Sequence, residues 1–315
     1  PTVDNIASVA AVDLLGNGTA CLVWSSPLPN ETNAPLRYIE LMAEGKPHLM
    51  VRSKNNLGAE THIQYVPSTY FYLKDKQAGK PWITLLPFPV HVVEKVTVTD
   101  KWSGTQFSTS YSYHHGYFDG KEREFRGFGR VEQIDAESFG EFTEGNINSP
   151  YISDDHTLYQ PPIKTVSWFH TGVSNDRKQI LSQFEHEYFN PNKNNSPDGF
   201  KEAELPEPDL KQSDLTADEW REAMRACKGM PLRQEIYELD VDALEQGEHK
   251  RVKIYSSAYH NCNIQMLQAQ AKNKHAVFLV TESEAITYQY ELDLLDVSAK
   301  ADPRIAHTLN LNIDE

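Results

Sequence analysis

The residues with the greatest potential for catalysis lie together in one strand-like segment. His114 and His115 are followed closely by Asp119, and imidazole and carboxylate groups can transfer protons or bind a metal ion. Adjacent residues on a β-strand point to opposite faces, so the two histidines can share a metal only where the strand bulges. We therefore predict hydrogen-bonded, structural histidines at the end of a strand and no metal site.

A run of alternating charges follows this trio. Glu122 and Glu124 could supply the paired carboxylates that glycoside hydrolysis needs, with Arg123 and Arg126 beside them. Alternating charges on a hairpin also form cross-strand ion pairs, which protect a sheet edge from aggregation. The second interpretation is the one we adopt, and it assigns the four side chains a structural role.

The remaining nucleophiles and metal ligands form no recognisable set. Cys21, Cys227 and Cys262 are odd in number and widely spaced, which predicts free buried thiols. The Glu-His-Glu run at residues 185–187 cannot assemble a metal site if it is extended. The sequence contains no His-Glu-x-x-His, no Gly-x-Ser-x-Gly and no phosphate-binding glycine loop. We predict no catalytic, cofactor-binding or metal-binding residues, and no enzyme activity.

The elements that position these residues are mostly strands. β-Branched and aromatic residues recur at every second position, which is typical of strands that bury one face. Gly and Asn residues that favour turns separate the segments. The clearest alternating segments are residues 61–65, 90–99, 107–114, 286–292 and 309–313. The predicted fold class is all-β.

One helix has strong support in the sequence. Thr216 and Glu219 form a capping box, and Gly229 stands where the helix should stop, so we predict a helix over residues 217–228. A weaker pattern predicts a second helix over residues 176–188, although a strand after a bend explains it nearly as well. The first helix has an apolar stripe of four residues, Trp220, Ala223, Met224 and Cys227.

Composition restricts the classes of partner. The 315 residues suffice for one to three domains with a real core, and the formal net charge is −15, from 45 acidic and 30 basic residues. No cluster of Lys and Arg is present to bind phosphates, so nucleic acid is excluded as a partner. No run of 18 apolar residues exists, so we expect no direct membrane insertion. The chain starts at Pro1 without a visible signal peptide, and we expect it to be a segment of a longer polypeptide.

Several long motifs in a fixed order resemble one protein family. The chain is similar to the middle region of the B component, of the TcaC and TcdB type, of the insecticidal Tc toxin complexes. The resemblance is strong over residues 46–239 and adequate over the last forty residues. The motifs that carry it are Asn55-Asn56-Leu57-Gly58-Ala59-Glu60-Thr61, Leu86-Pro87-Phe88-Pro89-Val90-His91, Tyr113-His114-His115-Gly116-Tyr117-Phe118-Asp119-Gly120, Glu122-Arg123-Glu124-Phe125-Arg126-Gly127-Phe128-Gly129, Trp168-Phe169-His170-Thr171-Gly172 and Asp302-Pro303-Arg304-Ile305.

This resemblance implies a structural function. B and C subunits of such complexes resemble Rhs/YD-repeat proteins, which wrap antiparallel sheet into a hollow shell around the cytotoxic segment of the C subunit. A β-propeller connects that shell to the pentameric A subunit, a translocation pore. The partners implied are therefore the C and A subunits, and the place of action is extracellular, within the secreted toxin complex. The catalytic parts implied by the family belong to the C subunit.

The resemblance also implies two domains. Residues 1–34 resemble the last part of the β-propeller, and residues 35–315 resemble the shell, with one or two short helices. Within the shell, the proline-rich segment 190–214 has almost nothing apolar to bury and predicts an exposed loop. The turn after Asp13 retains a single carboxylate, so it predicts a structural hairpin and no calcium site.

Two rival functions remain open from the residues alone. A polysaccharide-active enzyme requires a cleft with two carboxylates about 5–10 Å apart. A carbohydrate-binding or adhesion module requires exposed Trp and Tyr side chains on one strand face. A curved sheet without such a cleft favours the shell.

Overall fold

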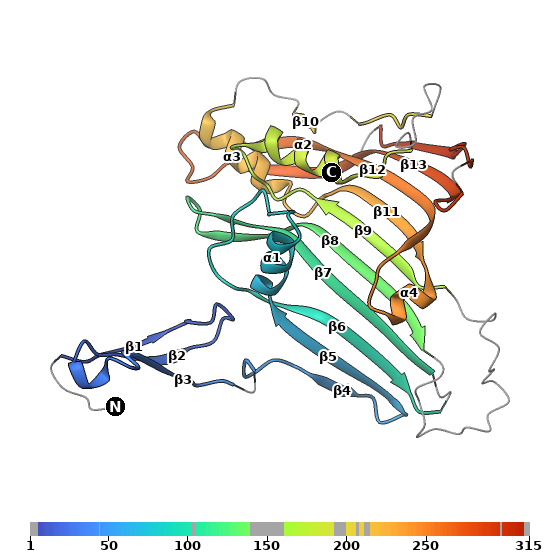
Figure 1. Ribbon diagram of the computed structural model, residues 1–315. Helices are drawn as coiled ribbons and strands as arrows, with labels where there is room; N and C mark the ends of the chain where they lie inside the picture. Colours follow the sequence, from blue (N-terminus) through green and yellow to red (C-terminus); the bar gives the residue numbers. More distant parts are fainter. Residues whose placement is uncertain are drawn as a thin grey trace.

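The computed structural model describes residues 6–43, 45–102, 105–138, 161–191, 200–205, 208–210, 215–296 and 298–311. These residues form two antiparallel sheets of very different size, with helices beside the larger one (Figure 1). The strands of the smaller sheet are β1 (Ser8–Val12), β2 (Cys21–Ser25) and β3 (Leu36–Glu40), and a short 3-10 helix, Pro29–Glu31, lies between the last two.

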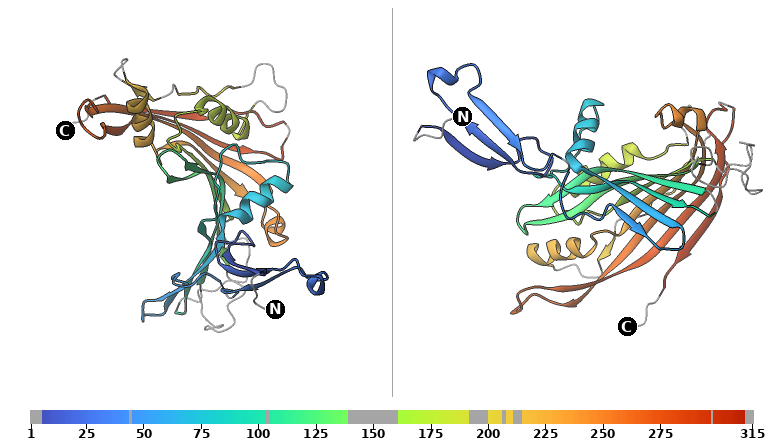
Figure 2. Two further views of the ribbon diagram at one scale, coloured as in Figure 1. Left: turned by 90° about the vertical axis from the view of Figure 1, so that its left-hand side faces the viewer. Right: turned by 90° about the horizontal axis from the view of Figure 1, so that it is seen from below.

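The larger sheet has eleven strands and supplies most of the molecule. Its order is β14-β13-β12-β11-β9-β8-β7-β6-β5-β4, and the short β10 runs parallel beside β12. The strands are β4 (Arg52–Lys54), β5 (Ala59–Pro67), β6 (His91–Asp100), β7 (Thr105–Asp119), β8 (Glu124–Ser138), β9 (Ile163–Phe169), β10 (Asp209–Leu210), β11 (Pro231–Leu239), β12 (Arg251–Gln268), β13 (Val277–Asp293) and β14 (Arg304–Leu309). The sheet is long and curved (Figure 2), as expected for a wall built from successive hairpins.

Most of the predicted strands are confirmed. Residues 61–65 lie within β5, 107–114 within β7 and 286–292 within β13, and residues 90–99 coincide with β6 except at their first position. The last predicted strand, residues 309–313, is wrong in its position: β14 spans Arg304–Leu309, so the two share only Leu309, and residues 310 and 311 lie outside any strand. Residues 312–315 lie outside the described part of the chain.

Both predicted helices are present. Helix α3 (Ala217–Ala226) begins at Thr216, whose side chain accepts a hydrogen bond from the Glu219 amide in a complete capping box. Helix α2 (Arg177–Glu187) settles the weaker case in favour of a helix. Figure 1 also shows two helices that the sequence did not predict, α1 (Ser68–Gln77) and α4 (Val241–Glu245).

The register of the strands defines two faces of the larger sheet. Directly opposed residues of antiparallel strands share a face, and their sequence neighbours point the other way. One row across β8, β9, β11, β12 and β13 comprises Arg130, Trp168, Arg233, Tyr259 and Ile286. Helix α2 and the Asp75 side chain of α1 contact this row's side of the sheet, which we call the covered face.

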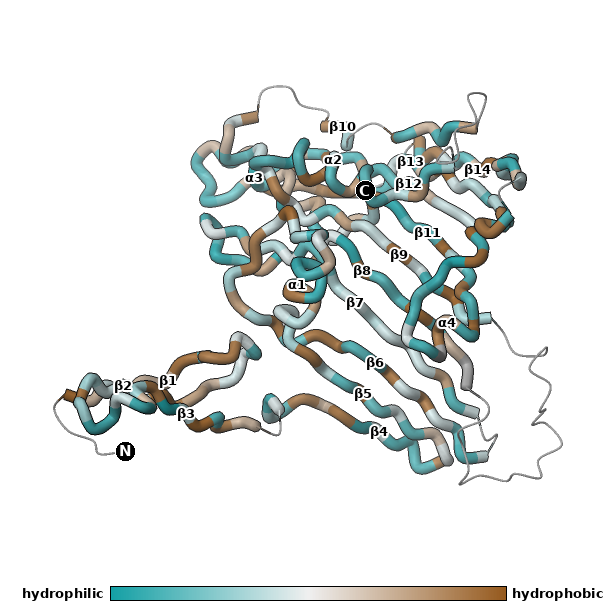
Figure 3. Tube along the Cα trace, viewed as in Figure 1, coloured by the Kyte–Doolittle hydropathy of each residue, from teal (hydrophilic) through white to brown (hydrophobic). Residues whose placement is uncertain are grey.

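The neighbouring row lies on the opposite side, which we call the open face. It comprises Val131, Ser167, Gln234, Ala258 and Thr287. Gln234 is exposed and the other four are half-buried, whereas Trp168 and Arg233 on the covered face are 1% and 0% exposed. Hydrophobic and hydrophilic residues are accordingly interspersed along the strands (Figure 3).

The core lies between the covered face and the helices. Its main cluster includes Trp168, Tyr237 and Ile254 from the sheet and Ile180 and Phe184 from α2. A second cluster joins Ala223 and Met224 of α3 to strand β12. Trp220 does not follow the predicted apolar stripe, since it is 38% exposed while Ala223 and Met224 are buried.

Candidate functional site: charge clusters at the covered face

The two adjacent histidines of β7 are both buried and both contact carboxylates. His114 Nδ1 lies 2.5 Å from Asp75 Oδ2 of α1, and His115 Nε2 lies 2.9 Å from Glu187 Oε1 of α2. Burial lowers the pKa of His114, although Asp75 opposes that effect. The predicted role as hydrogen-bonded strand histidines is confirmed. One partner lies on α1, which the sequence did not predict, and the other on α2, which it did.

One arginine connects the two histidine contacts. Arg130 Nη1 lies 2.5 Å from Glu187 Oε2, and its Nη2 lies 3.3 Å from Glu132 Oε1. The Glu132 carboxylate also contacts Lys164, through Oε2, and His114, through Oε1. Burial by itself would raise the pKa of Glu187, but His115 and Arg130 outweigh it and lower that pKa to about 2. The carboxylate is therefore a permanently ionised structural partner and a poor general acid.

The backbone explains how neighbouring histidines reach the same charge network. His115 has a φ of 56°, in the left-handed region, and the pairing with β8 shifts register between Gly116 and Phe118. Such an irregularity turns a side chain out of the regular alternation. Asp119 does not join the histidines, because its carboxylate lies 2.9 Å from Arg126 Nη2 and accepts hydrogen bonds from the amides of Lys121 and Glu122.

The alternating charges after β7 pair mainly with helix α3. Glu122 Oε1 accepts a hydrogen bond of 2.9 Å from Arg221, and Glu124 accepts bonds of 2.8 and 3.0 Å from Arg225 and Lys228. The predicted structural role is supported, but the expected cross-strand pairing is wrong for these two glutamates. Both carboxylates are occupied by cations and dock the β7–β8 hairpin onto the helix.

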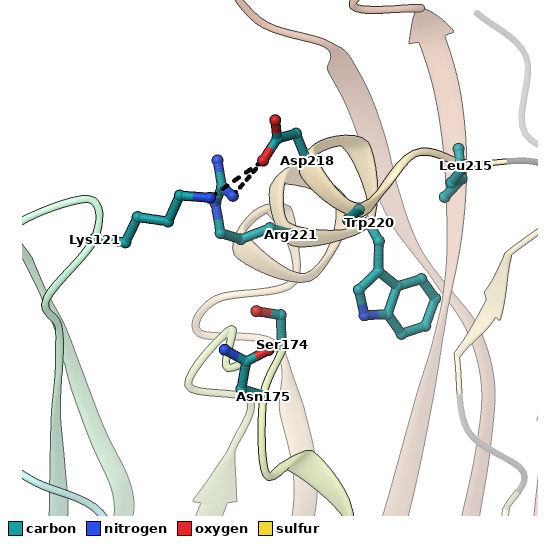
Figure 4. Close-up of a pocket in the computed structure, with 8 residues that line it drawn as sticks. Lys121, Ser174, Asn175, Leu215, Asp218, Trp220 and Arg221 are labelled. Atoms are coloured by element: carbon teal, nitrogen blue, oxygen red, sulfur yellow. Dashed lines mark hydrogen bonds and ion pairs between the residues drawn. The ribbon is translucent and has the colours of Figure 1, made fainter.

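A surface pocket of about 690 Å³ lies beside this docking point (Figure 4). Figure 4 shows Trp220 and Asp218 from the start of α3, with Ser174 and Asn175 below the helix and Lys121 across from it. Asp218 is the sole carboxylate among the described residues that line the pocket, and it pairs with Arg221 and Lys121. The pocket therefore lacks the second carboxylate that glycoside hydrolysis requires.

The cysteines are free and buried, as predicted. The structure adds that Cys227, at the end of α3, lies 3.9 Å from Cys262 of β12, sulfur to sulfur. Their hydrogen bond and their burial raise the pKa of Cys227, which keeps this thiol protonated and unreactive at neutral pH.

The turn between β1 and β2 is held together by its polar side chains. Asp13 accepts hydrogen bonds from the amides of Asn17 and Gly18, at 3.0 and 2.8 Å, and Asn17 Oδ1 accepts from Thr19. Both oxygens of the Asp13 carboxylate, the one carboxylate of this turn, thus accept hydrogen bonds from backbone amides. Across the described residues, no three His, Cys, Asp or Glu side chains form a group that could hold a metal ion.

A second buried charge cluster was not predicted from the sequence. Arg233 and Glu235, two residues apart on β11, are both fully buried and joined by a 2.7 Å contact between Nε and Oε1. The Arg233 guanidinium contacts the rings of Tyr188 and Tyr259, 4.8 and 4.3 Å from their centroids. The neighbouring acidic charges raise the pKa of Arg233 although burial opposes them. Arg233, Glu235 and Tyr237 occupy every second position and so share one face of a strand, but charged residues in this pattern are also typical of a strand face that is exposed to solvent.

Two family models match the chain. The model for the middle/N-terminal region of the insecticide toxin TcdB matches residues 1–156, and the model for its middle/C-terminal region matches residues 222–315. No curated protein matches the chain. None of the helices in the described ranges has the length and apolar character needed to cross a bilayer.

Solved structures of similar sequence share the fold over nearly the whole chain. A Photorhabdus luminescens Tc holotoxin pore matches with 26% identity, a TM-score of 0.74 and coverage of 99% of this chain. A TcdB2–TccC3 crystal structure matches with 26% identity, a TM-score of 0.72 and the same coverage. A TcdB2–TccC3–Cdc42 structure matches with 25% identity, a TM-score of 0.67 and 92% coverage. The chain spans 12–13% of the length of these chains.

Proposed function

Because the chain belongs to the TcdB family of insecticidal toxin proteins, we propose that it forms a section of the wall of a toxin-enclosing shell. Its activity in this proposal is mechanical and not enzymatic. The observation that carries the proposal is the two-sided, curved sheet: over β8–β13, α2 and buried charges cover one face, while the row from Val131 to Thr287 on the other face is uncharged and at most half-buried. The ionisable groups described above are occupied in pairs that join helices to strands, which suits a wall better than a reaction centre.

The two sheets fit different parts of such a protein. The three-stranded sheet extends to Glu40, past the expected boundary at residue 34, and we propose that it is the end of a β-propeller. All residues of its outer strands β1 and β3 except Glu40 are exposed, as expected for strands that pack on further blades. The larger sheet is the shell section in this proposal.

The proposal extends to partners and location. The similar structures contain TcdB2 together with TccC3, or a complete Tc holotoxin pore. By analogy we propose that this chain acts with a C subunit, which carries the toxic segment, and with a pentameric A subunit. The complex would act outside the producing cell.

A protease-protection experiment tests this proposal. The complete protein is co-expressed with its C subunit, and the wild-type shell should protect the toxic segment from added protease. Ile254→Asp places a charge in the covered core, where Ile254 is 0% exposed, and should abolish protection. Gln234→Asp, on the open face of the adjacent strand, is the matched control and should preserve it. An unprotected segment in the wild-type complex would refute the shell function.

A further inference from the structure

Residues 200–205, which we call the strap, bind to the covered face without belonging to a strand. This segment lies within the loop that was predicted to be exposed, and that prediction is wrong for it. Glu202 is 7% exposed, and Phe200 and Leu205 pack against the main core cluster. A single glutamate and two apolar side chains fix a segment that is otherwise polar.

Three donors from three strands converge on the Glu202 carboxylate. Oε2 accepts a 2.6 Å hydrogen bond from Arg233 Nη1 of β11. Oε1 accepts bonds from Ser257 Oγ of β12, at 2.5 Å, and from the Tyr290 hydroxyl of β13, at 2.7 Å. This is the geometry of a ligand carboxylate in a binding site, with one guanidinium and two hydroxyl donors around it.

The strap backbone and its aromatic residue are recognised as well. The Ala203 amide donates to the Tyr288 hydroxyl at 2.8 Å, and the same hydroxyl lies 3.2 Å from the Ala203 carbonyl oxygen. The Phe200 ring stands edge-on to Tyr288 and Tyr290, with centroids 5.6 and 6.3 Å away. Side chain, backbone and aromatic contacts together specify a short peptide and not an isolated carboxylate.

The receiving surface is organised by groups outside the strap. Glu235 pairs with Arg233, and the rings of Tyr188 and Tyr259 contact the guanidinium, so groups other than Glu202 also position the cation. All of these groups come from β11–β13 or from the end of α2. We call this surface the cradle; it consists of Tyr188, Arg233, Glu235, Ser257, Tyr259, Tyr288 and Tyr290.

We propose that the cradle is a peptide-binding site occupied in cis by the strap. Its ligand class is an acidic peptide with an aromatic residue two positions before a glutamate, as in Phe200 and Glu202. The site does not depend on the shell function proposed above, because every contact lies within this chain. The strap ties β11, β12 and β13 together and can be exchanged for the same peptide supplied in trans.

The test empties the cradle and refills it. In the complete protein, Phe200→Ala and Glu202→Ala are combined, and a fluorescent peptide of the strap sequence, Phe-Lys-Glu-Ala-Glu-Leu, is titrated while its anisotropy is recorded. The emptied protein should bind the peptide, and the wild type should bind at least ~10-fold more weakly because its strap competes. A peptide with Gln in place of the first Glu should lose ~10-fold or more in affinity, since it lacks the charge-assisted bonds. A peptide with Gln in place of the second Glu is the matched control, because Glu204 is exposed.

A second measurement covers the case in which the double variant does not fold. Hydrogen exchange at the Ala203 amide is followed in the wild type and in Glu202→Gln, a nearly isosteric change. Exchange should accelerate in the variant and return toward the wild-type rate when the wild-type peptide is added. Unchanged exchange in Glu202→Gln, or equal peptide binding by the wild type and the emptied protein, would overturn the proposal.

Discussion

The two faces of the larger sheet are made by the same strands and yet differ in almost every physical property. On β11, Arg233 and Glu235 point to the covered face and are fully buried, while Gln234 between them is exposed on the open face. The neighbouring strands repeat this division, with Trp168 beside Ser167 and Ile286 beside Thr287. Over β8–β13 the buried contacts thus lie mainly on one side. At β7 the open side is also packed, because Phe71 of α1 contacts Tyr113, which opposes Val131.

This asymmetry shows how one face of a sheet can hold helices while the other carries few charges. Buried aromatic residues and paired charges on the covered face hold helices against the strands. The described row on the open face carries small or uncharged side chains, Val131, Ser167, Gln234, Ala258 and Thr287, which offer neither a charge nor a large apolar surface. A substitution should therefore have an effect set by its face, and the following predictions test that rule.

The largest effect is expected from Arg233→Met. The change leaves the Glu202 and Glu235 carboxylates buried without their shared cation, which should cost about 3–5 kcal/mol of local stability. Gln234→Met changes the next residue on the open face and should stay within about 0.5 kcal/mol of the wild type. Hydrogen exchange of the β11 and β12 amides in increasing urea measures both. Equal effects of the two substitutions would contradict the difference between the faces.

A smaller effect, of about 2 kcal/mol, is expected when the pH is lowered from 6.5 to 5. Burial, with a contribution from Arg177, lowers the pKa of His170 to about 3, so the folded protein keeps this imidazole neutral. Between about pH 6.5 and 3 the unfolded chain binds a proton that the folded chain does not, and stability falls as the pH falls.

The pH range from 6.5 to 5 distinguishes the effect of His170 from the effect of the acidic groups, which titrate at lower pH. Glu187 has a pKa of about 2 in the folded protein. The stability that it contributes is lost only as the pH falls from about 4.5 through about 2. His170→Gln should reduce the slope of stability against pH between 6.5 and 5, measured by urea titration at each pH. His114, whose pKa is also lowered by burial, retains a part of the slope. An unaltered slope in His170→Gln would show that this imidazole is not held neutral.

Local signals in the sequence were sufficient for α3 and for strands β5, β6, β7 and β13, whereas β9, β11 and β12 were not predicted. Alternation specifies strands wherever one face is buried, and the capping box of Thr216 and Glu219 acts within four residues. Helix α1 has no such signal: its first residue, Ser68, is fixed by hydrogen bonds with Val90, the residue just before β6. The first residues of the helix itself, with alternating Tyr70 and Tyr72, could equally have continued β5.

The buried charge clusters were invisible for the same reason. Glu202 and Arg233 are far apart in the sequence and meet only when the strap lies on the sheet. Equally, His115 meets Glu187 only because the backbone of His115 is left-handed and α2 covers β7 at that point. Period-two alternation predicts which residues share a face, but it does not identify what covers that face.

A modest effect is expected from His115→Gln. Glutamine retains a hydrogen-bond donor for Glu187, which also keeps Arg130 and Gln183 as partners, so the loss should be about 1 kcal/mol. In the assembled toxin, delivery of the toxic segment should be nearly unchanged. His115→Leu removes the donor altogether and should destabilise the protein more. Abolished delivery in His115→Gln with normal assembly would reveal a chemical role for this imidazole and would refute the mechanical function.

The smallest effects are expected at ion pairs on the exposed rim of the β7–β8 hairpin. Lys121 and Asp218 have side chains 66% and 52% exposed, so solvent and salt screen their attraction. Lys121→Ala should leave the melting temperature of the complete protein unchanged within error. Glu122→Ala removes the partner of Arg221 in a pair that is 23% and 17% exposed, and it should cost up to about 1 kcal/mol. Lys121 and Glu122 are adjacent in the sequence, and each forms an ion pair with a residue of α3. The main difference between the two ion pairs is therefore how far they are buried. If raising the salt concentration from 50 to 500 mM weakened the Lys121 contact and the Glu122 contact equally, burial would not be what distinguishes strong from weak pairs in this molecule.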